Sequence, residues 1–173
     1  MVRSTGFPPI VDASAKVLIL GSLPSVRSIE AFEYYAHPQN AFWRIMGELF
    51  GAGPDIPYIR RAELLKRNNV AVWDVLASSV RPGSMDSAID ESTANPNDFA
   101  SLFNSCPDIS LVCFNGQKAA GMFKKLVLSE QDDLRHGMRY ETLPSTSPAF
   151  ASMPFEEKLQ KWSIVSRRKR RKK

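Results

Sequence analysis

Four short segments of the chain are rich in apolar or β-branched residues, and they lie at 17–20, 70–75, 109–114 and 139–143. Runs of this length and composition are typical of strands that are buried in a sheet. We therefore predict a buried strand at each of the four segments.

Amphipathic stretches separate the predicted strands. From Phe42 to Phe50, apolar residues recur at positions i, i+3, i+4, i+7 and i+8, and Gly51 follows them, so a helix is predicted over 42–50. Similar spacing predicts four more helices, at 57–69, between Pro96 and Pro107, at 117–127 and from Pro154 through Trp162.

The alternation of strands and helices predicts an α/β fold. In such folds, right-handed crossovers build a largely parallel sheet that helices cover on both faces. Ligands bind there at the carboxyl ends of the strands. A binding site is therefore expected among the loops at 21–40, 74–95, 115–117 and 144–153.

The composition fits one small protein domain. The chain has 173 residues, of which 43% are hydrophobic, and we expect residues 1–166 to form a single domain. Its apolar runs are far shorter than the roughly 18 residues of a membrane-spanning helix. Residues 1–9 lack the apolar stretch of a secretory signal. The sequence thus predicts an intracellular protein without a membrane span.

The cysteine content argues against several kinds of site. Cys106 and Cys113 are the two cysteines of the chain, too few for an iron–sulfur cluster, a Cys-only zinc site or a disulfide scaffold. We expect both thiols to be reduced. The two histidines, His37 and His136, show no recognisable metal-ligand spacing with Cys113, so no metal site is predicted.

The positive charge is concentrated at one end of the chain. The net charge is +5, but residues 167–173 are all Lys or Arg, so 23 minus 7 leaves 16 cationic residues against 18 Asp and Glu. The rest of the chain therefore carries −2. Like charges in a run repel one another, which predicts a disordered tail. Such a tail binds phosphates, acts as a nuclear import signal in a eukaryote, or is foreign to the natural sequence.

Three strand-end loops contain compact groups of amide, hydroxyl and aromatic residues. They are Gly21-Ser22-Leu23-Pro24-Ser25 with Tyr35-Ala36-His37-Pro38-Gln39-Asn40 further along the same loop, Phe114-Asn115-Gly116, and Ser145-Thr146-Ser147-Pro148-Ala149-Phe150. Each group alone has a plain structural interpretation: a tight turn, a helix-capping asparagine, a turn dipeptide and a rigid surface turn.

Taken together, these loops resemble the motifs of the uracil-DNA glycosylase superfamily, and most of all those of its hypoxanthine-DNA (deoxyinosine) glycosylase branch. The resemblance covers residues 15–165, and its most specific part is the His-Pro-x-Asn-x-Phe-Trp stretch at 37–43. It implies a three-layer α/β/α sandwich with a short, mainly parallel central sheet. It also implies an enzyme without a cofactor that hydrolyses the N-glycosidic bond of a deaminated base in DNA.

The resemblance assigns the catalytic residues. In many members of the superfamily, the third residue of the first motif activates the attacking water, but Leu23 stands at that position here. In the deoxyinosine branch the role falls to the asparagine that matches Asn40. The resemblance therefore implies that Asn40 is catalytic, together with Ser22 of the first motif.

The resemblance also implies how base and DNA are held. Tyr35 matches the residue whose ring stacks on the flipped base and Asn115 the amide that reads its edge, with Gly21 and Leu23 lining the base site. DNA contacts are implied for two loops, consisting of Pro24, Ser25, Ser145, Thr146, Ser147, Pro148, Ala149 and Phe150.

Two positions of the second loop depart from the family pattern. Relatives have a histidine where this chain has Ser145, so imidazole assistance to the leaving base is absent. The loop also supplies a wedge that fills the gap left by the flipped base. Because Ala149 is too small for that, Phe150 is the expected wedge.

The chemistry of these residues is consistent with base release. Hypoxanthine and uracil both present a carbonyl beside a ring N–H, and the Asn115 amide can pair with both groups once neighbours fix its orientation. Since an amide is a very weak base, Asn40 would orient water rather than deprotonate it. A dissociative, metal-free hydrolysis by a monomer is expected, and strand cleavage is not, because no Lys lies in these loops.

Other interpretations remain open. Asp74, Asp86 and Asp90 follow the second predicted strand and suit acid–base or magnesium chemistry, although acidic residues there are more often caps or solvated, which we favour. A serine hydrolase would use Ser22 or Ser25 with a histidine, but the G-x-S-x-G spacing is missing. Uracil removal, and a non-catalytic DNA-binding module on the same fold, are the alternatives to hypoxanthine removal.

Overall fold

Four parallel strands form the central sheet of the computed structural model, which describes residues 2–130 and 137–166. They are β2 (Val17–Gly21), β3 (Val70–Asp74), β6 (Leu111–Asn115) and β7 (Arg139–Leu143), in the order β3-β2-β6-β7. Every neighbouring pair is parallel. The four predicted strands and the largely parallel sheet are confirmed.

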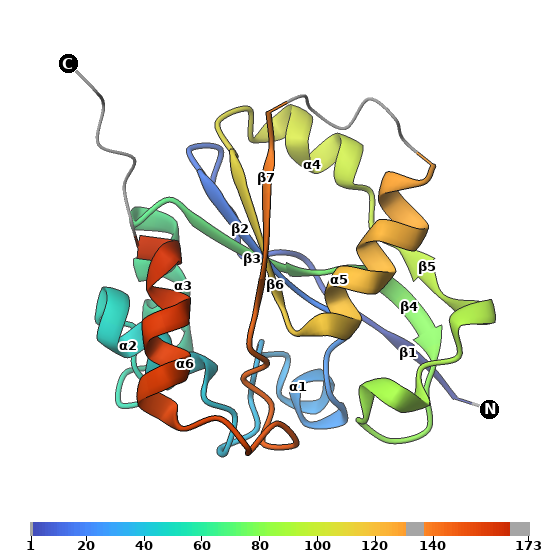
Figure 1. Ribbon diagram of the computed structural model, residues 1–173, viewed down its shortest axis with the longest axis horizontal. Helices are drawn as coiled ribbons and strands as arrows, with labels where there is room; N and C mark the ends of the chain where they lie inside the picture. The colour runs from blue at the N-terminus through green and yellow to red at the C-terminus, as the bar shows by residue number, and fades with distance from the viewer. Residues whose placement is uncertain (1, 131–136, 167–173) are drawn as a thin grey trace.

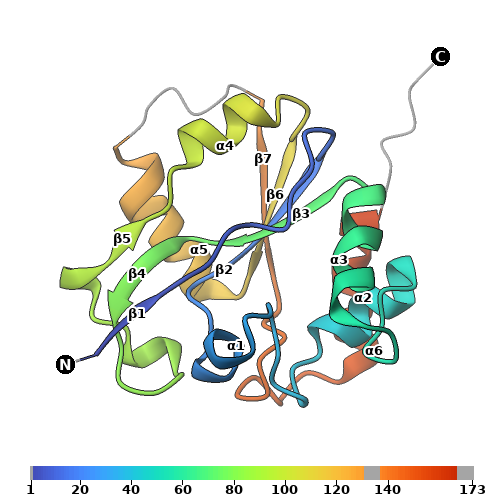
Figure 2. The same cartoon turned by 180° about the vertical axis from the view of Figure 1, so that it is seen from behind.

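Helices cover both faces of this sheet (Figures 1 and 2). On one face lie α2 (Phe42–Phe50), α3 (Tyr58–Arg67) and α6 (Phe155–Trp162), and on the other lie α4 (Phe99–Ser105) and α5 (Gln117–Phe123). The five predicted helices are therefore present: α2 has the predicted bounds, and the other four end up to several residues inside theirs. Residues 124–128 continue α5 as a π-helical turn.

Alternation along the central strand β2 divides the core into two clusters. Leu18 and Leu20 pack with Phe99 and Phe123 on the α4/α5 side. Ile19, which points to the opposite face, packs with Phe42 on the α2/α6 side. Because β2 is buried on both faces, its sequence is apolar at successive positions rather than at every second one.

The helix α2 shows why its sequence pattern was a good predictor. Phe42, Ile45 and Met46 are fully buried, and they are the residues that the helical spacing placed on one face. The helix ends where Gly51 adopts a left-handed conformation with φ 71°, as expected for a glycine that terminates a helix.

A second, smaller sheet is an element that the sequence analysis did not predict. Its strands are β1 (Arg3–Thr5), β4 (Leu76–Val80) and β5 (Asn95–Pro96), which are antiparallel in the order β1-β4-β5. β4 lies within the segment 74–95 that was expected to be a loop, followed by 3-10 turns at Asp86–Ala88 and Glu91–Thr93. Its sequence, Leu-Ala-Ser-Ser-Val, is too short and polar to show a strand pattern.

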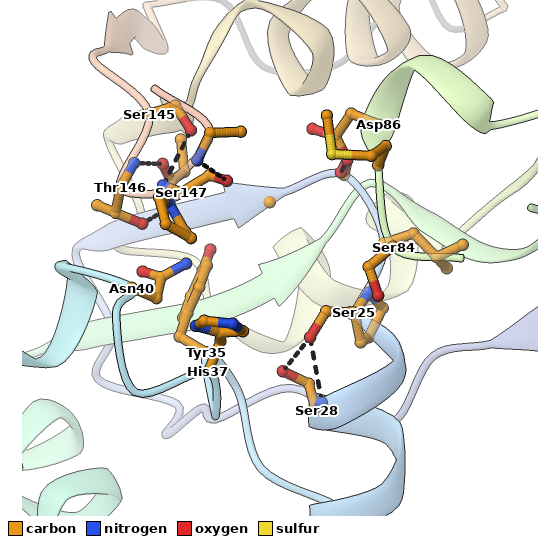
Figure 3. A pocket seen from close by; sticks show the side chains of 18 of the residues that line it. Ser25, Ser28, Tyr35, His37, Asn40, Ser84, Asp86, Ser145, Thr146 and Ser147 are labelled. Atoms are coloured by element: carbon orange, nitrogen blue, oxygen red, sulfur yellow. Dashed lines mark hydrogen bonds between the residues drawn. The ribbon is translucent and has the colours of Figure 1, made fainter. Parts of the chain in front are cut away.

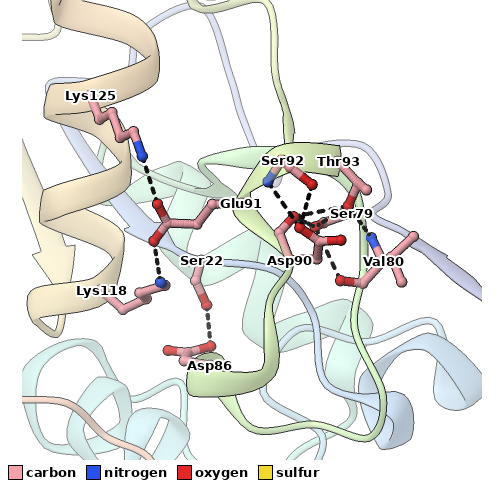
Figure 4. Close-up of polar contacts among 10 residues, drawn as sticks. All are labelled: Ser22, Ser79, Val80, Asp86, Asp90, Glu91, Ser92, Thr93, Lys118 and Lys125. Atoms are coloured by element: carbon pink, nitrogen blue, oxygen red, sulfur yellow. Dashed lines mark hydrogen bonds and ion pairs between the residues drawn. The ribbon is translucent and has the colours of Figure 1, made fainter.

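The segment after β4 is attached to the body by polar contacts (Figure 4). Glu91 accepts hydrogen bonds from Lys118 at 2.6 Å and Lys125 at 2.8 Å, which joins the segment to α5 and its continuation. These two ammonium groups lower the pKa of Glu91 to about 2. The hydrogen bond from the Ser22 hydroxyl to Asp86 joins the 81–88 segment to the carboxyl end of β2.

The parallel strands bring their carboxyl ends to one edge of the sheet, at the lower side of Figure 1. The short helix α1 (Val26–Ala31) and the loop after β7 lie there. Within the described ranges, no helix is long and apolar enough to cross a membrane. The predicted tail at 167–173 lies outside the described residues.

Candidate functional site

A pocket with a volume of about 550 Å³ opens at the carboxyl edge of the main sheet (Figure 3). Every residue that the sequence predicted for the site lines it, from the first loop, from 35–40, from the end of β6 and from the loop after β7. The structure also adds residues that were not predicted: Ser28, Tyr34, His37, Asp74, Ser84, Met85, Asp86 and Ser87.

The first loop, residues 21–25, is held by backbone and side-chain contacts. Val75 and Leu76 donate backbone hydrogen bonds to the carbonyls of Gly21 and Ser22, at 2.8 and 3.0 Å. The buried guanidinium of Arg81 donates to the carbonyls of Leu23 and Pro24. Since Arg81 is 3% exposed, the loop rests on a fixed cation that the sequence analysis missed.

The two serines of this loop have different partners. Ser22 is buried, and its hydroxyl donates to Asp86 Oδ1 at 2.5 Å (Figure 4). Ser25 caps α1, because its hydroxyl accepts a hydrogen bond from the Ser28 N–H at 3.1 Å. Neither hydroxyl contacts a histidine in the described structure, so the serine hydrolase interpretation lacks its base.

Tyr35 presents an aromatic ring at the pocket. Its ring stacks on Phe42 with a centroid distance of 4.0 Å and an interplanar angle of 23°. Tyr35 has φ 55°, a left-handed conformation that is costly for a non-glycine residue and requires support from its surroundings. The neighbouring residue Tyr34 supplies this support, because the Tyr34 carbonyl accepts a hydrogen bond from Trp43 Nε1 at 2.7 Å.

Asn40 lies at the start of α2 and lines the same pocket (Figure 3). Its Oδ1 accepts a hydrogen bond from the Phe42 N–H at 3.0 Å, although Ala41 is the capping residue of the helix. The expected capping contact is therefore present. A carbonyl oxygen has two lone pairs, so this bond leaves Oδ1 able to accept a second hydrogen bond.

Asn115 and Thr146 form a paired contact that the sequence did not reveal. Thr146 N–H donates to Asn115 Oδ1, and Asn115 Nδ2 donates to Thr146 Oγ1, both at 2.9 Å. Because a backbone N–H can only donate, it fixes Oδ1 on its own side and excludes the flipped amide. One N–H and one lone pair of the amide remain for another partner.

The loop after β7 is ordered by its own hydroxyls. Ser145 Oγ accepts from Ser147 N–H and Ser147 Oγ accepts from Ala149 N–H, both at 3.2 Å. The side chain of Thr146 is buried and bonds Asn115, so we expect the DNA contacts of this loop to come from its neighbours. Phe150 is 38% exposed, and its carbonyl accepts from Lys158 Nζ at 2.6 Å.

Asp74 corrects one interpretation of the sequence. We favoured a cap or a solvated role, but Asp74 is 4% exposed and lines the pocket. Burial raises its pKa to about 7, and Asp86 adds to the rise. The capping interpretation does apply to Asp90, whose Oδ1 accepts from the Ser92 N–H at 3.0 Å. The signal in the sequence that could have placed Asp74 at the pocket is its position at the carboxyl end of a predicted strand.

The histidines and possible metal ligands are placed as follows. His37 lines the pocket, and its Nδ1 accepts a hydrogen bond from the Gln39 N–H at 3.1 Å. His136 lies outside the described residues. Within the part of the chain that the structure describes, no group of three or more His, Cys, Asp or Glu side chains is arranged to hold a metal ion.

The substitution Thr146→Val tests how much the hydrogen bond between Asn115 and the Thr146 hydroxyl contributes to stability, at constant side-chain volume. Valine keeps the volume of threonine but removes the acceptor of Asn115 Nδ2, so an unsatisfied amide N–H remains in a buried position. The expected loss is about 1–3 kcal/mol of unfolding free energy, measured by urea denaturation. Thr146→Ser, which keeps the hydroxyl, is the matched control, and equal stability of both variants would contradict the assigned contact.

Comparison with known proteins finds a matching family and two similar proteins. A family model described as the uracil DNA glycosylase superfamily matches residues 8–166. Hypoxanthine DNA glycosylase from Methanosarcina acetivorans is 42% identical over 147 residues, which are 83% of this chain and 86% of the relative. Hypoxanthine DNA glycosylase from Methanosarcina barkeri is 38% identical over 142 residues, 82% of this chain and 83% of the relative.

A solved structure shows the same architecture. The solution NMR structure of a candidate uracil DNA glycosylase from Methanosarcina acetivorans superimposes with a TM-score of 0.75 and 34% sequence identity. The match covers 96% of this chain and all of that one. It confirms the predicted fold class, and the resemblance drawn from the loop motifs is confirmed by the family match. This chain belongs to the uracil DNA glycosylase superfamily.

Proposed function

We propose that this chain removes hypoxanthine from deoxyinosine in DNA by hydrolysing the N-glycosidic bond, which leaves an abasic site. The proposal is carried by the relatives named hypoxanthine DNA glycosylase, which match more than four fifths of the chain at 42% and 38% identity. The geometry supports it, because the loops that carry the family motifs surround one pocket at the carboxyl edge of the sheet.

The pocket suits an extrahelical nucleotide. Inside a duplex the glycosidic bond of a base is out of reach, so the nucleotide has to rotate into the enzyme. The cost is a few kcal/mol and is smallest for mispaired bases, which favours deaminated ones. The volume of about 550 Å³ is in the range of small-molecule sites. The half-buried ring of Tyr35 at the pocket would stack on the base.

Asn40 positions the water in this mechanism. Its Oδ1 is fixed by the Phe42 N–H at 3.0 Å and can accept one further hydrogen bond from water. Since an amide cannot remove the proton from water at neutral pH, Asn40 orients the nucleophile and does not activate it. The glycosidic bond therefore has to break before the water attacks.

Bond breaking leaves a cationic sugar and an anionic base. Fixed dipoles around the pocket stabilise these charges without having to reorganise. The paired contact with Thr146 holds the Asn115 amide in one orientation, with an N–H left to donate to the base. No lysine is among the residues that line the pocket within the described chain, so the reaction is hydrolysis without strand cleavage.

DNA is held mainly by uncharged groups in this proposal. The hydroxyls of Ser145 and Ser147 only accept within the loop, so their hydrogens are suited to phosphate oxygens, which fix position without reading sequence. Residues 1–166 carry a net charge of −2, so the cationic run at 167–173 would add salt-dependent affinity. A monomer is sufficient, because every residue assigned to the site comes from one chain.

The test is single-turnover base release from short duplexes that contain one deoxyinosine or one deoxyuridine, with an undamaged duplex as control. Hot alkali then reveals abasic sites. We expect faster alkali-dependent cleavage at deoxyinosine than at deoxyuridine. Binding of DNA without cleavage of either duplex would contradict the enzymatic proposal and favour a DNA-binding module.

Uracil removal is the second candidate, and one observation favours it. The solved structure that superimposes with a TM-score of 0.75 is described as a candidate uracil DNA glycosylase. Uracil presents the same carbonyl and ring N–H to an amide as hypoxanthine does. Faster release at deoxyuridine in the same assay would select this candidate.

A further inference from the structure

Asp74 is the last residue of β3, and its carboxyl group is buried where the pocket meets the sheet. The parallel register pairs it with Gly21 of β2. A Cβ atom at Gly21 would lie 2.5 Å from Asp74 Oδ1 and 2.9 Å from Tyr35 Oη. The missing side chain at Gly21 therefore makes room for both polar groups.

Both of these groups contain a buried oxygen without a partner. Asp74 Oδ2 and Tyr35 Oη form no hydrogen bond of good geometry in the described structure, and the Asn115 side chain is the polar group that interacts with Tyr35 Oη. Buried polar atoms nearly always have a partner, because an unmade hydrogen bond is costly. Two such atoms around one glycine, in residues that line one pocket, indicate a polar ligand that supplies the missing partner.

The charges around Asp74 come from several elements. The pKa of Asp74 is raised to about 7, chiefly by desolvation and to a smaller extent by Asp86, while Arg81 lowers it. Arg81 is already bonded to three backbone carbonyls, so it does not form an ion pair with Asp74. Three tyrosines also interact with the carboxyl group, namely Tyr34 and Tyr35 from the loop before α2 and Tyr58 from α3.

We propose that Asp74, as a neutral carboxylic acid, donates a hydrogen bond to the carbonyl oxygen of the flipped deaminated base and thereby selects it over the amino-bearing parent base. This inference rests on the proposed function and names the group that recognises the substrate of the same pocket. Deamination converts an amino donor into a carbonyl acceptor, so a selective site has to offer a donor there. A carboxylate offers no donor, whereas the neutral acid does.

The same hydrogen bond favours the reaction. When the bond between C1′ and N9 breaks, its electron pair leaves with hypoxanthine, and part of that charge resides on the carbonyl oxygen. The O–H of Asp74 stabilises this charge, whereas an ionised Asp74 repels it. The water oxygen forms the new bond to C1′, and its proton ends on the released base by way of solvent. Asp74 keeps its own proton throughout.

The test is the pH profile of single-turnover release from a deoxyinosine duplex, between about pH 6 and pH 9, for the full chain. We expect the wild-type rate to fall above about pH 7, by close to tenfold per pH unit, because ionisation removes the donor. Asp74→Asn has a similar shape and an N–H donor that does not titrate. It should keep the rate within about tenfold of wild type at pH 7 and lose the decline.

Asp90→Asn is the matched control, because it makes the same change from carboxylate to amide at a capping residue that does not line the pocket. Asp90→Asn should keep the wild-type profile. A wild-type enzyme that releases hypoxanthine at a rate independent of pH would overturn the inference and leave the proposed function standing. So would an Asp74→Asn variant that keeps the decline. No release by the wild type at any pH overturns both, and a wild-type profile independent of pH overturns the inference even if Asp74→Asn does not fold.

Discussion

Asn40→Ala is expected to slow single-turnover release of hypoxanthine by about 100- to 1,000-fold, the cost of removing one well-placed polar group from an active site. The rate should fall because the held water loses the Oδ1 acceptor, while the binding of duplex DNA stays nearly unchanged. The measurement is a rapid-quench time course with enzyme in excess. A wild-type rate in this variant would remove Asn40 from the mechanism.

The same substitution has a structural cost that needs its own control. Asn40 Oδ1 accepts the Phe42 N–H at the start of α2, and loss of such a contact costs about 1 kcal/mol. Asn40→Ser retains an oxygen that can accept this N–H but is too short to hold the water. We expect Asn40→Ser to recover most of the melting temperature and none of the rate, which separates folding from catalysis.

Gly21→Ala is expected to lower the rate by about 100-fold, comparable to the loss that a displacement of about 1 Å causes in an active site. The added methyl would lie 2.5 Å from Asp74 Oδ1 and 2.9 Å from Tyr35 Oη, so both side chains have to move. Crowding of this kind also costs about 1–3 kcal/mol of stability. Single-turnover release and thermal unfolding measure the two effects.

Gly121→Ala provides the matched control for that substitution. Gly121 lies in α5, and an added Cβ there meets no atom within 4 Å. Alanine favours a helix over glycine by up to about 1 kcal/mol, so this variant should be slightly more stable and equally active. If Gly21→Ala behaved in the same way, the close packing of Asp74 and Tyr35 around Gly21 would be wrong.

The main sheet and its helices were predictable because each carries a local signal. The helix α2 repeats apolar residues on one face and ends at a glycine, and the strands β2 and β6 are apolar up to their last residue because both of their faces are buried. β4 lacked such a signal. β4 is held by pairing with β1, which is distant in the sequence, and with β5, which follows after the two 3-10 turns. This pairing leaves no periodic pattern in Leu76–Val80.

The motif residues that line the pocket could be named from the sequence, but the contacts between them could not. The motif residues were identifiable along the chain, yet Thr146, the partner of Asn115, is 31 residues away in sequence. Asp74 was assigned a capping or solvated role because acidic residues in a loop before a helix are more often caps or solvated. Its burial depends on Gly21 in the neighbouring strand and on the 81–88 segment, whose path no local pattern predicted.

Thr146 contacts two parts of the pocket through three of its polar groups. Its N–H and its hydroxyl bond Asn115, and its carbonyl accepts the Ala41 N–H at 3.0 Å, next to Asn40. A strand of DNA that presses on the loop after β7 would therefore shift the groups that hold the base and the water together. If the loop after β7 contacts DNA as proposed, we therefore expect engagement of the sugar-phosphate chain to affect the alignment of the reacting groups through Thr146.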